Sequence, residues 1–154
     1  MNPPSLEFVF EVQAQLGPLC VLPTTGFGRE RAAIYVLEGA VRGPALNGRV
    51  LPNSGGDWAV ARPDGVLEFD ARYLLESDDG HTIYMQNRGL RWASPEVSER
   101  LKRGERVDPA DYYMRLSPSF EVQPGAHDWL NRHTFVGVGA RTATGNVVRY
   151  YKVL

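Results

Sequence analysis

Three short segments of alternating apolar and polar residues, joined by two Asp-Gly turns, constrain the fold of this chain more than any other feature. They run from Gly56 to Gly89, and the turns are Pro63-Asp64-Gly65 and Asp78-Asp79-Gly80. A three-residue loop, in which a type I turn is followed by a left-handed glycine, suits both turn sequences. It also keeps Pro63 out of a paired position, where its missing N–H would forfeit a ladder hydrogen bond. The segment therefore predicts three consecutive antiparallel strands in a fixed register.

This register places Ala71, in the middle strand, between Asp57 on one neighbouring strand and Asn87 on the other. Because side chains alternate between the two faces of a strand, the three residues share their face with a mostly apolar set. That set comprises Leu67, Phe69, Tyr73, Leu75, Ala59, Ala61, Ile83 and Met85. The opposite face is rich in charge, which is typical of a surface that meets solvent or another subunit. A carboxylate and a carboxamide on an otherwise apolar face form a candidate site.

Further strands are expected on both sides of this segment, together with one helix. Ser94 as N-cap, Pro95 at the first helical position and Gly104 as the stop predict the helix. Pro18 is expected to end the first strand. Alternation of apolar residues predicts the other strands over 6–15, 32–41, 48–51, 111–116, 133–140 and 147–153. About eight or nine short strands with one short helix favour a mainly all-β fold, a closed antiparallel β-barrel with the helix on its surface.

Composition narrows the class of partner. The chain has 154 residues, which favours one domain over residues 1–154. Its formal net charge is -1 and no run of like charges occurs, so neither nucleic acid nor an anionic membrane is implied as a partner. The lone Cys20 fits a reducing compartment, and no apolar run approaches the roughly 20 residues that span a bilayer. We therefore expect a cytoplasmic protein whose partners are small molecules or copies of itself, as a homo-oligomer.

Many short motifs, in order along nearly the whole chain from Gly26 onward, carry a resemblance to one family. They include Gly43-Pro44 with Asn47-Gly48, Gly56-Asp57-Trp58, Asp70-Ala71-Arg72-Tyr73, Asn87-Arg88-Gly89, Tyr112-Tyr113-Met114-Arg115, Phe120-Glu121 and Trp129-Leu130-Asn131. The chain resembles the domain-of-unknown-function family 3237. The resemblance implies a lipocalin-like or allene-oxide-cyclase-like barrel with a ligand-sized lumen, and it implies an oligomer. The function of this family is mostly unassigned, and some fungal members are associated with ring-forming steps on natural products.

Asp57 is the leading candidate for chemistry. In an apolar lumen, desolvation favours the neutral acid, which makes a general acid or base plausible near neutral pH. The alternatives are a carboxylate that accepts hydrogen bonds from neighbouring backbone amides, or an ion-pair partner of Arg72 or Arg115. Asn87 can donate to a developing oxyanion or simply anchor a turn. Tyr73 can donate a hydrogen bond beside Asp57 or serve only as core.

Other residues are expected to complete the site. Arg115 offers a permanent positive charge and planar donors for a carboxylate, enolate or phenolate, and its alternative role is a structural ion pair. Trp129 and Asn131 occupy alternate positions and are expected to line the pocket as a stacking wall and a polar anchor. Phe69 and Met85 are expected to contact the ligand.

No cofactor or metal is predicted. The three histidines, His81, His127 and His133, show no recognisable metal spacing, and neither a dinucleotide fingerprint nor a phosphate loop is present. Two hypotheses remain. The first is a cofactor-independent enzyme of the isomerase, cyclase or hydratase type that acts on a small carbonyl, phenolic or aromatic substrate. The second is a binding module that holds an apolar or aromatic ligand without turnover.

Overall fold

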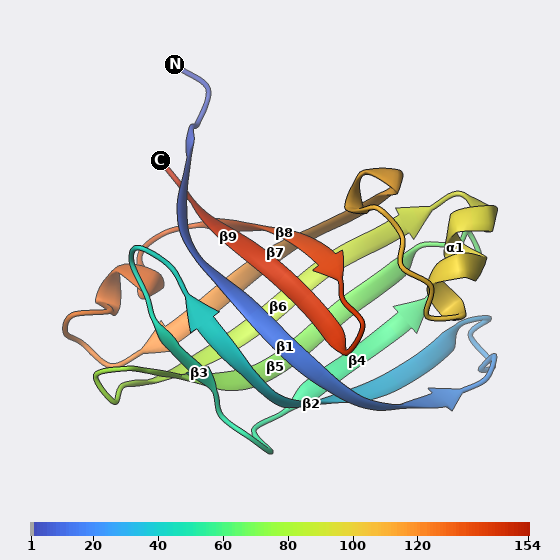
Figure 1. Cartoon of the computed structure of the whole chain (residues 1–154), viewed down its shortest axis with the longest axis horizontal. Coiled ribbons are helices and arrows are strands. Elements are labelled where there is room, and N and C mark those ends of the chain that lie inside the picture. Colours follow the sequence, from blue (N-terminus) through green and yellow to red (C-terminus); the bar gives the residue numbers. More distant parts are fainter. Residues whose placement is uncertain (1) are drawn as a thin grey trace.

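The barrel is built from strands that follow one another around a closed sheet (Figure 1), in a computed structural model that describes residues 2–154. Their bounds are β1 (Leu6–Leu22), β2 (Glu30–Arg42), β3 (Gly48–Val50), β4 (Gly56–Ala61), β5 (Leu67–Ser77), β6 (Thr82–Ala93), β7 (Tyr112–Val122), β8 (Phe135–Arg141) and β9 (Gly145–Val153). The helices are α1 (Pro95–Lys102) and two short 3₁₀ turns, η1 (Pro109–Asp111) and η2 (Asp128–Asn131).

All strand pairings are antiparallel, and one place in the barrel is shared by two strands. The order is β1, β9, β8, β7, β6, β5, and then β3 and β4, each of which pairs with both β5 and β2. Pairing of β2 with β1 closes the sheet. The result is a closed barrel of eight strand positions with one extra strand, as the sequence predicts.

The predicted register of the central strands is confirmed. Asp57 pairs with Ala71, and Ala71 pairs with Asn87. Both turns are three-residue loops: the Arg62 N–H donates to the Val66 carbonyl at 2.9 Å and the Ser77 N–H to the His81 carbonyl at 3.0 Å. The turn glycines at positions 65 and 80 have φ of 84° and 87°, the left-handed conformation that this loop requires.

The helix is confirmed, whereas the predicted end of the first strand is wrong. The Ser94 hydroxyl oxygen accepts from the Val97 N–H at 3.3 Å, and Gly104 follows the helix with φ of 74°. Strand β1 continues through Pro18, because register shifts between Gln15 and Leu19 leave the proline unpaired with β2. A proline without an N–H is tolerated at such a bulge.

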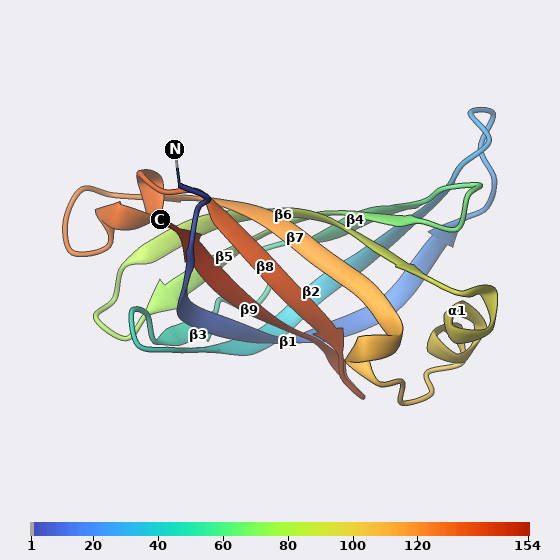
Figure 2. The same cartoon turned by 90° about the horizontal axis from the view of Figure 1, so that it is seen from above.

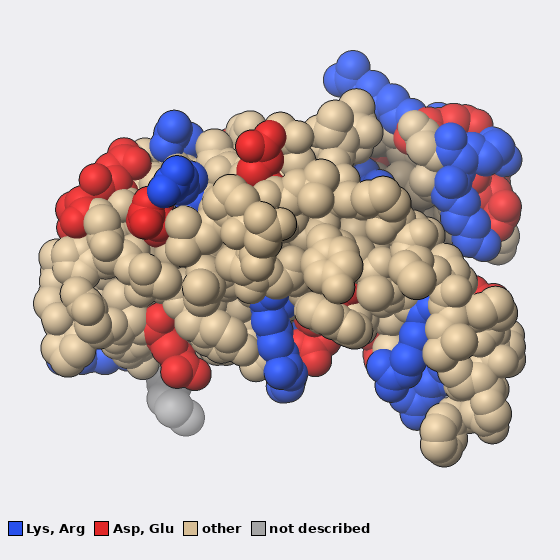
Figure 3. Space-filling view, turned by 90° about the horizontal axis from the view of Figure 1, so that it is seen from below, with Lys and Arg blue, Asp and Glu red and all other residues tan. Residues whose placement is uncertain are grey.

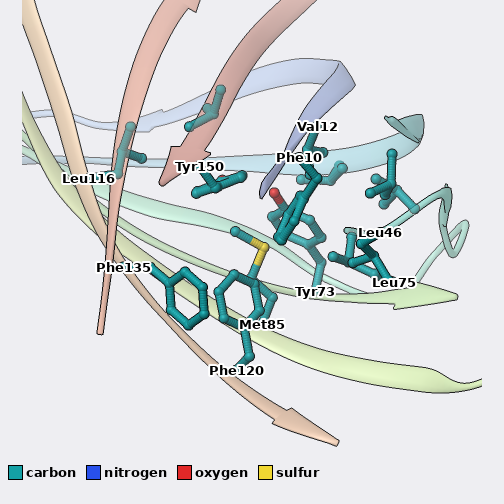
Figure 4. Packing of buried hydrophobic residues seen from close by; sticks show 14 of the residues in the cluster. Phe10, Val12, Leu46, Tyr73, Leu75, Met85, Leu116, Phe120, Phe135 and Tyr150 are labelled. Atoms are coloured by element: carbon teal, nitrogen blue, oxygen red, sulfur yellow. The ribbon is translucent and has the colours of Figure 1, made fainter. Parts of the chain in front are cut away.

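The two ends of the barrel differ in how they are filled. Large aromatic side chains pack one end of the interior (Figure 4), with ring centroids 5.1 Å apart for Phe120 and Phe135 and 5.2 Å for Phe10 and Tyr150. Figure 2 shows α1 at the opposite end from the chain termini. Among residues 2–154, no helix combines the length and the apolar character that a membrane crossing demands.

Candidate functional site

A cavity of about 380 Å³ opens at the end of the barrel beside α1. Its walls are mostly apolar and include Leu16, Ile34, Phe69, Leu116 and Val148. Its mouth lies between the end of α1, the end of β1 and the start of β2. Figure 3 shows the surface hollowed at this end, between a lobe rich in charged side chains and a lobe that is mostly uncharged. A cavity of this size and lining suits a small apolar or aromatic molecule.

Asp57 projects from β4 into this cavity. The backbone N–H of Asp70 donates to its Oδ1 at 2.9 Å, at a point where the β4–β5 ladder has no paired residues. No described residue donates to Oδ2, which leaves this oxygen for a ligand. Burial raises the pKa of Asp57 to about 6, with a smaller contribution from the charge of Asp70, and the backbone hydrogen bond opposes the rise.

Tyr73 and Asn87 form the polar floor of the cavity with Tyr150 beneath them. The Asn87 Nδ2 donates to the Tyr150 hydroxyl at 2.8 Å, and the Asn87 Oδ1 is buried without a partner among the described residues. Burial raises the pKa of Tyr73 to about 12, and its hydrogen bond with Tyr150 opposes the rise. Tyr73 is therefore a neutral hydrogen-bond donor near Asp57, whose charge also raises the pKa of this phenol.

Two arginines in the cavity wall were missed by sequence reasoning. Arg91, on β6, and Arg141, at the end of β8, both line the cavity towards its mouth. Burial, and then the charge of Arg141, hold the pKa of the Arg91 guanidinium below its usual value. The signal for Arg91 was present in the sequence, because residues four apart on a strand share a face and Asn87 was already placed in the lumen.

Of the two predicted contact residues on the central strands, the structure brings only Phe69 to the cavity. Met85 faces the interior as expected but lies among the packed aromatic residues, fully buried and away from the cavity lining. The sequence predicted correctly that Met85 faces the interior. It did not predict the position of Met85 along the barrel axis, because alternation determines only the face of the strand.

Arg115 does not join the site, contrary to expectation. On β7 the inward positions are Tyr112, Met114 and Leu116, so Arg115 points to the outside. There its guanidinium lies 5.1 Å from the ring centroid of Tyr113, and its Nη1 donates to the Met114 carbonyl at 3.0 Å. Strand alternation is the physical reason, and it removes Arg115 as a partner for Asp57.

Trp129 and Asn131 also lie elsewhere. They belong to the 3₁₀ turn η2, so the alternation assumed for a strand does not apply to them. Trp129 packs on Phe135, with ring centroids 5.8 Å apart, at the filled end of the barrel. Asn131 holds the end of β7, because its Oδ1 accepts from the Val122 N–H at 2.9 Å and its Nδ2 donates to the Val122 carbonyl at 2.8 Å. Both residues are structural in this arrangement.

A second cluster of titratable groups lies outside the cavity, at the β5–β6 turn. Asp79, His81 and His127 bring potential ligand atoms within 4.8 Å of one another, a grouping that can hold a metal ion. The His127 Nε2 lies 2.9 Å from both Asp79 oxygens. Hydrogen bonds from Ser77 and then His127 hold the pKa of Asp79 below its usual value. The spacing of these residues in the sequence does not predict the cluster, because His127 lies in a loop far along the chain from Asp79 and His81.

Known proteins resemble this chain along its full length. The UPF0311 protein RPA1785 of Rhodopseudomonas palustris is 39% identical over 153 residues, covering 98% of this chain and 99% of the relative. The crystal structure of RPA1785 superposes with a TM-score of 0.94 at 35% identity, covering 100% of each chain. A protein with unknown function from Clostridium acetobutylicum superposes with a TM-score of 0.87 at 34% identity, covering 99% of this chain and 100% of the other.

A more distant relative has a name that states an activity. The hydroalkoxylation enzyme phnH of Penicillium herquei is 24% identical over 156 residues, covering 99% of this chain and 85% of the relative. The structure of an enzyme from the same fungus has a TM-score of 0.75 at 21% identity, a likeness of fold. The family described as "Protein of unknown function (DUF3237)" matches residues 4–153, and together with the relatives above this match shows that the chain belongs to that family.

Proposed function

We propose that this protein is a small-molecule-binding barrel, lipocalin-like in its use of the lumen, and a cofactor-independent acid/base enzyme of the isomerase, cyclase or hydratase type. Its substrate is a small carbonyl, phenolic or aromatic compound. The observation that carries the proposal is Asp57, a carboxyl group with a pKa of about 6 and one unpartnered oxygen in an apolar cavity. A group with such a pKa exchanges protons readily near neutral pH.

The neighbours of Asp57 supply the other requirements of proton transfer. Tyr73 is a neutral donor that can hydrogen-bond a substrate oxygen as negative charge develops on it. Asn87 lines the floor of the cavity, and its amide oxygen is buried there without a partner among the described residues. The Asn87 Nδ2 donates to Tyr150, and the Tyr150 hydroxyl also hydrogen-bonds with Tyr73, so the Oδ1 is the Asn87 atom that lacks a partner.

The distant fungal relative supports acid/base chemistry in this fold. Hydroalkoxylation, by its name, adds an alcohol O–H across a carbon–carbon double bond. That addition takes a proton from oxygen and delivers one to carbon, which a single carboxyl group can mediate. We therefore propose the same class of proton transfer for this chain, which is 24% identical to phnH.

Proton exchange tests the proposal without knowledge of the natural substrate. 2-Tetralone, a cavity-sized aromatic ketone with acidic protons, is incubated in D₂O and followed by NMR. We expect the wild-type protein to accelerate deuterium incorporation, with a rate that rises as pH passes about 6 and Asp57 ionises. Asp57→Asn should lower the rate by about two to four orders of magnitude, and Glu121→Gln, on the outer face of β7, should leave it unchanged.

The binding-module hypothesis predicts a different result. It is favoured by the hydrogen bond from the Asp70 N–H, which gives Asp57 a role in strand pairing. If 2-tetralone binds without accelerated exchange, or if Asp57→Asn retains the full rate, Asp57 is no proton-transfer group and the lumen is a binding site.

A further inference from the structure

We propose that the molecule bound in the cavity carries an anionic oxygen group such as a carboxylate, and that Arg91 and Arg141 bind this group at the mouth. The inference rests on the proposed function, since it names the chemical class of the ligand in the same cavity. It identifies the ligand as an apolar or aromatic acid with its charged group towards α1 and its reacting oxygen towards Asp57.

The two arginines converge from strands on either side of β7. Arg91 pairs with Met114 of β7, and both side chains face the cavity. Arg141 ends β8, and its backbone N–H donates to the inward-facing Tyr112 hydroxyl at 2.8 Å. The guanidinium groups lie close enough for the charge of Arg141 to lower the pKa of Arg91.

Neither guanidinium has an anionic partner among the described residues. The Arg91 guanidinium makes no hydrogen bond or ion pair within residues 2–154, and the Arg141 Nη1 donates only to the neutral Asn146 Oδ1, at 3.1 Å. Eight other arginines lie within 4.0 Å of a carboxylate: Arg49, Arg62, Arg72, Arg88, Arg100, Arg103, Arg132 and Arg149. Among the described residues, Arg29, Arg31, Arg42, Arg106 and Arg115 also lack a carboxylate partner, and of these only Arg31 lines the cavity.

Without a ligand, the uncompensated positive charges of Arg91 and Arg141 destabilise the folded protein. Burial lowers the pKa of Arg91, and the charge of Arg141 adds to this effect. Arg141 is exposed at the end of β8, and partial desolvation there lowers its pKa as well. Two of the described carboxyl groups line the cavity, and neither offsets this charge: the charge that acts on Asp57 is that of Asp70, and Glu30 acts on Lys102. A bound oxyanion removes the repulsion and accepts paired N–H donors, for which guanidinium geometry is suited.

The spacing sets the shape of the ligand. Arg91 and Asn87 lie four residues apart on β6, which corresponds to roughly 13 Å along the strand. The reach of the arginine side chain shortens this separation. The walls between the two levels are apolar, with Phe69 and Leu116 among them. A ligand that contacts both Arg91 and Asn87 has its anionic group and its reacting oxygen at opposite ends of an apolar body.

A matched pair of fluorescent probes tests the inference. 1-Anilinonaphthalene-8-sulfonate and N-phenyl-1-naphthylamine share one ring system, and only the first carries an anionic group. We expect Arg91→Leu to weaken binding of the sulfonate by about 10- to 100-fold and binding of the neutral amine by less than about 3-fold. Arg115→Leu, on the outer face of β7, should change neither affinity. The melting temperature of Arg91→Leu should equal or exceed that of the wild type, because a repelled cation is removed.

The outcomes separate this inference from the proposed function. If Arg91→Leu weakens both probes equally, or weakens neither, anion recognition is overturned while the acid/base role of Asp57 stands on its own exchange assay. If the wild-type protein binds neither probe, the cavity does not accept aromatic ligands, and the inference fails together with the binding role of the lumen. A lower melting temperature for Arg91→Leu assigns Arg91 to structure and also overturns the inference.

Discussion

The side chain of Asn87 donates to the hydroxyl of Tyr150 at 2.8 Å, a contact between β6 and β9 across the interior of the barrel. It joins the floor of the cavity to the packed aromatic end, since Tyr150 is fully buried and its ring lies 5.2 Å from that of Phe10. The same residues that fill the packed aromatic end of the barrel therefore hold the polar site in place.

The first prediction follows from this hydrogen bond. Tyr150→Phe leaves the Asn87 Nδ2 buried without its acceptor, so the free energy of unfolding should fall by about 1–3 kcal/mol. Urea denaturation measures the change. Tyr151→Phe is the control, because Tyr151 is only half-buried and faces the other side of β9. Equal stability of the two variants would show that the contact contributes nothing.

The second prediction concerns pH. Because burial raises the pKa of Asp57 from 3.8 to about 6, the folded state favours the neutral acid. The stability that the group contributes is present below pH 4 and is lost as the pH rises through about 6. Asp57→Asn should therefore match the wild type at pH 4 and exceed it at pH 8, by about 2 kcal/mol. Thermal denaturation at the two pH values measures the difference, and a variant that is less stable at pH 8 contradicts the sign.

The third prediction tests the close approach of β4 to β5. A Cβ added at Gly55 would lie 1.8 Å from the Arg72 carbonyl oxygen, which is backbone and cannot move aside. Gly55→Ala should therefore lower the free energy of unfolding by about 3 kcal/mol and disturb Asp57 nearby. Gly26→Ala, where nothing lies within 4 Å of the added atom, should stay within about 0.5 kcal/mol of the wild type. Chemical denaturation of both variants makes the comparison, and similar losses would refute the close approach.

The fourth prediction is that the protein forms a homo-oligomer through the outer face of β4 to β7. Trp58, Leu90, Trp92 and Tyr113 are exposed there by 49%, 41%, 54% and 40%, and the last two rings stack with centroids 6.0 Å apart. Exposed aromatic groups of this kind mark subunit contacts. Light scattering should give a multiple of 17.1 kDa, and Trp92→Glu should reduce it.

The control for this prediction is Leu154→Glu, which places the same charge on an exposed residue at the chain terminus. It should leave the mass unchanged. A mass of 17.1 kDa for the wild-type protein at micromolar concentration would contradict oligomerisation.

The turn sequences explain how much of the site could be predicted. Each Asp-Gly loop fixes one register, and a register assigns every side chain on two strands to a face, which placed Asp57 and Asn87 together. The same rule, continued along β6, reaches Arg91. Arg115 was misplaced because no tight turn ties β7 to its neighbours, although the inward apolar residues at 112, 114 and 116 indicate the correct phase.

The remaining differences depend on tertiary structure. Alternation gives no position along the barrel axis, so Met85 and Phe69 looked equivalent although only Phe69 reaches the cavity. The contact of His127 with Asp79 joins residues 48 positions apart through a loop without a repeating pattern. No local propensity carries that information.

The unequal filling of the two barrel ends separates the packed core from the residues around the cavity. The aromatic cluster around Phe120 and Tyr150 belongs to the buried core, while Leu19 and Val21 at the mouth are exposed. Substitutions at the mouth can therefore accumulate during evolution at little cost to folding, so related barrels are free to diverge in ligand while their scaffold stays the same.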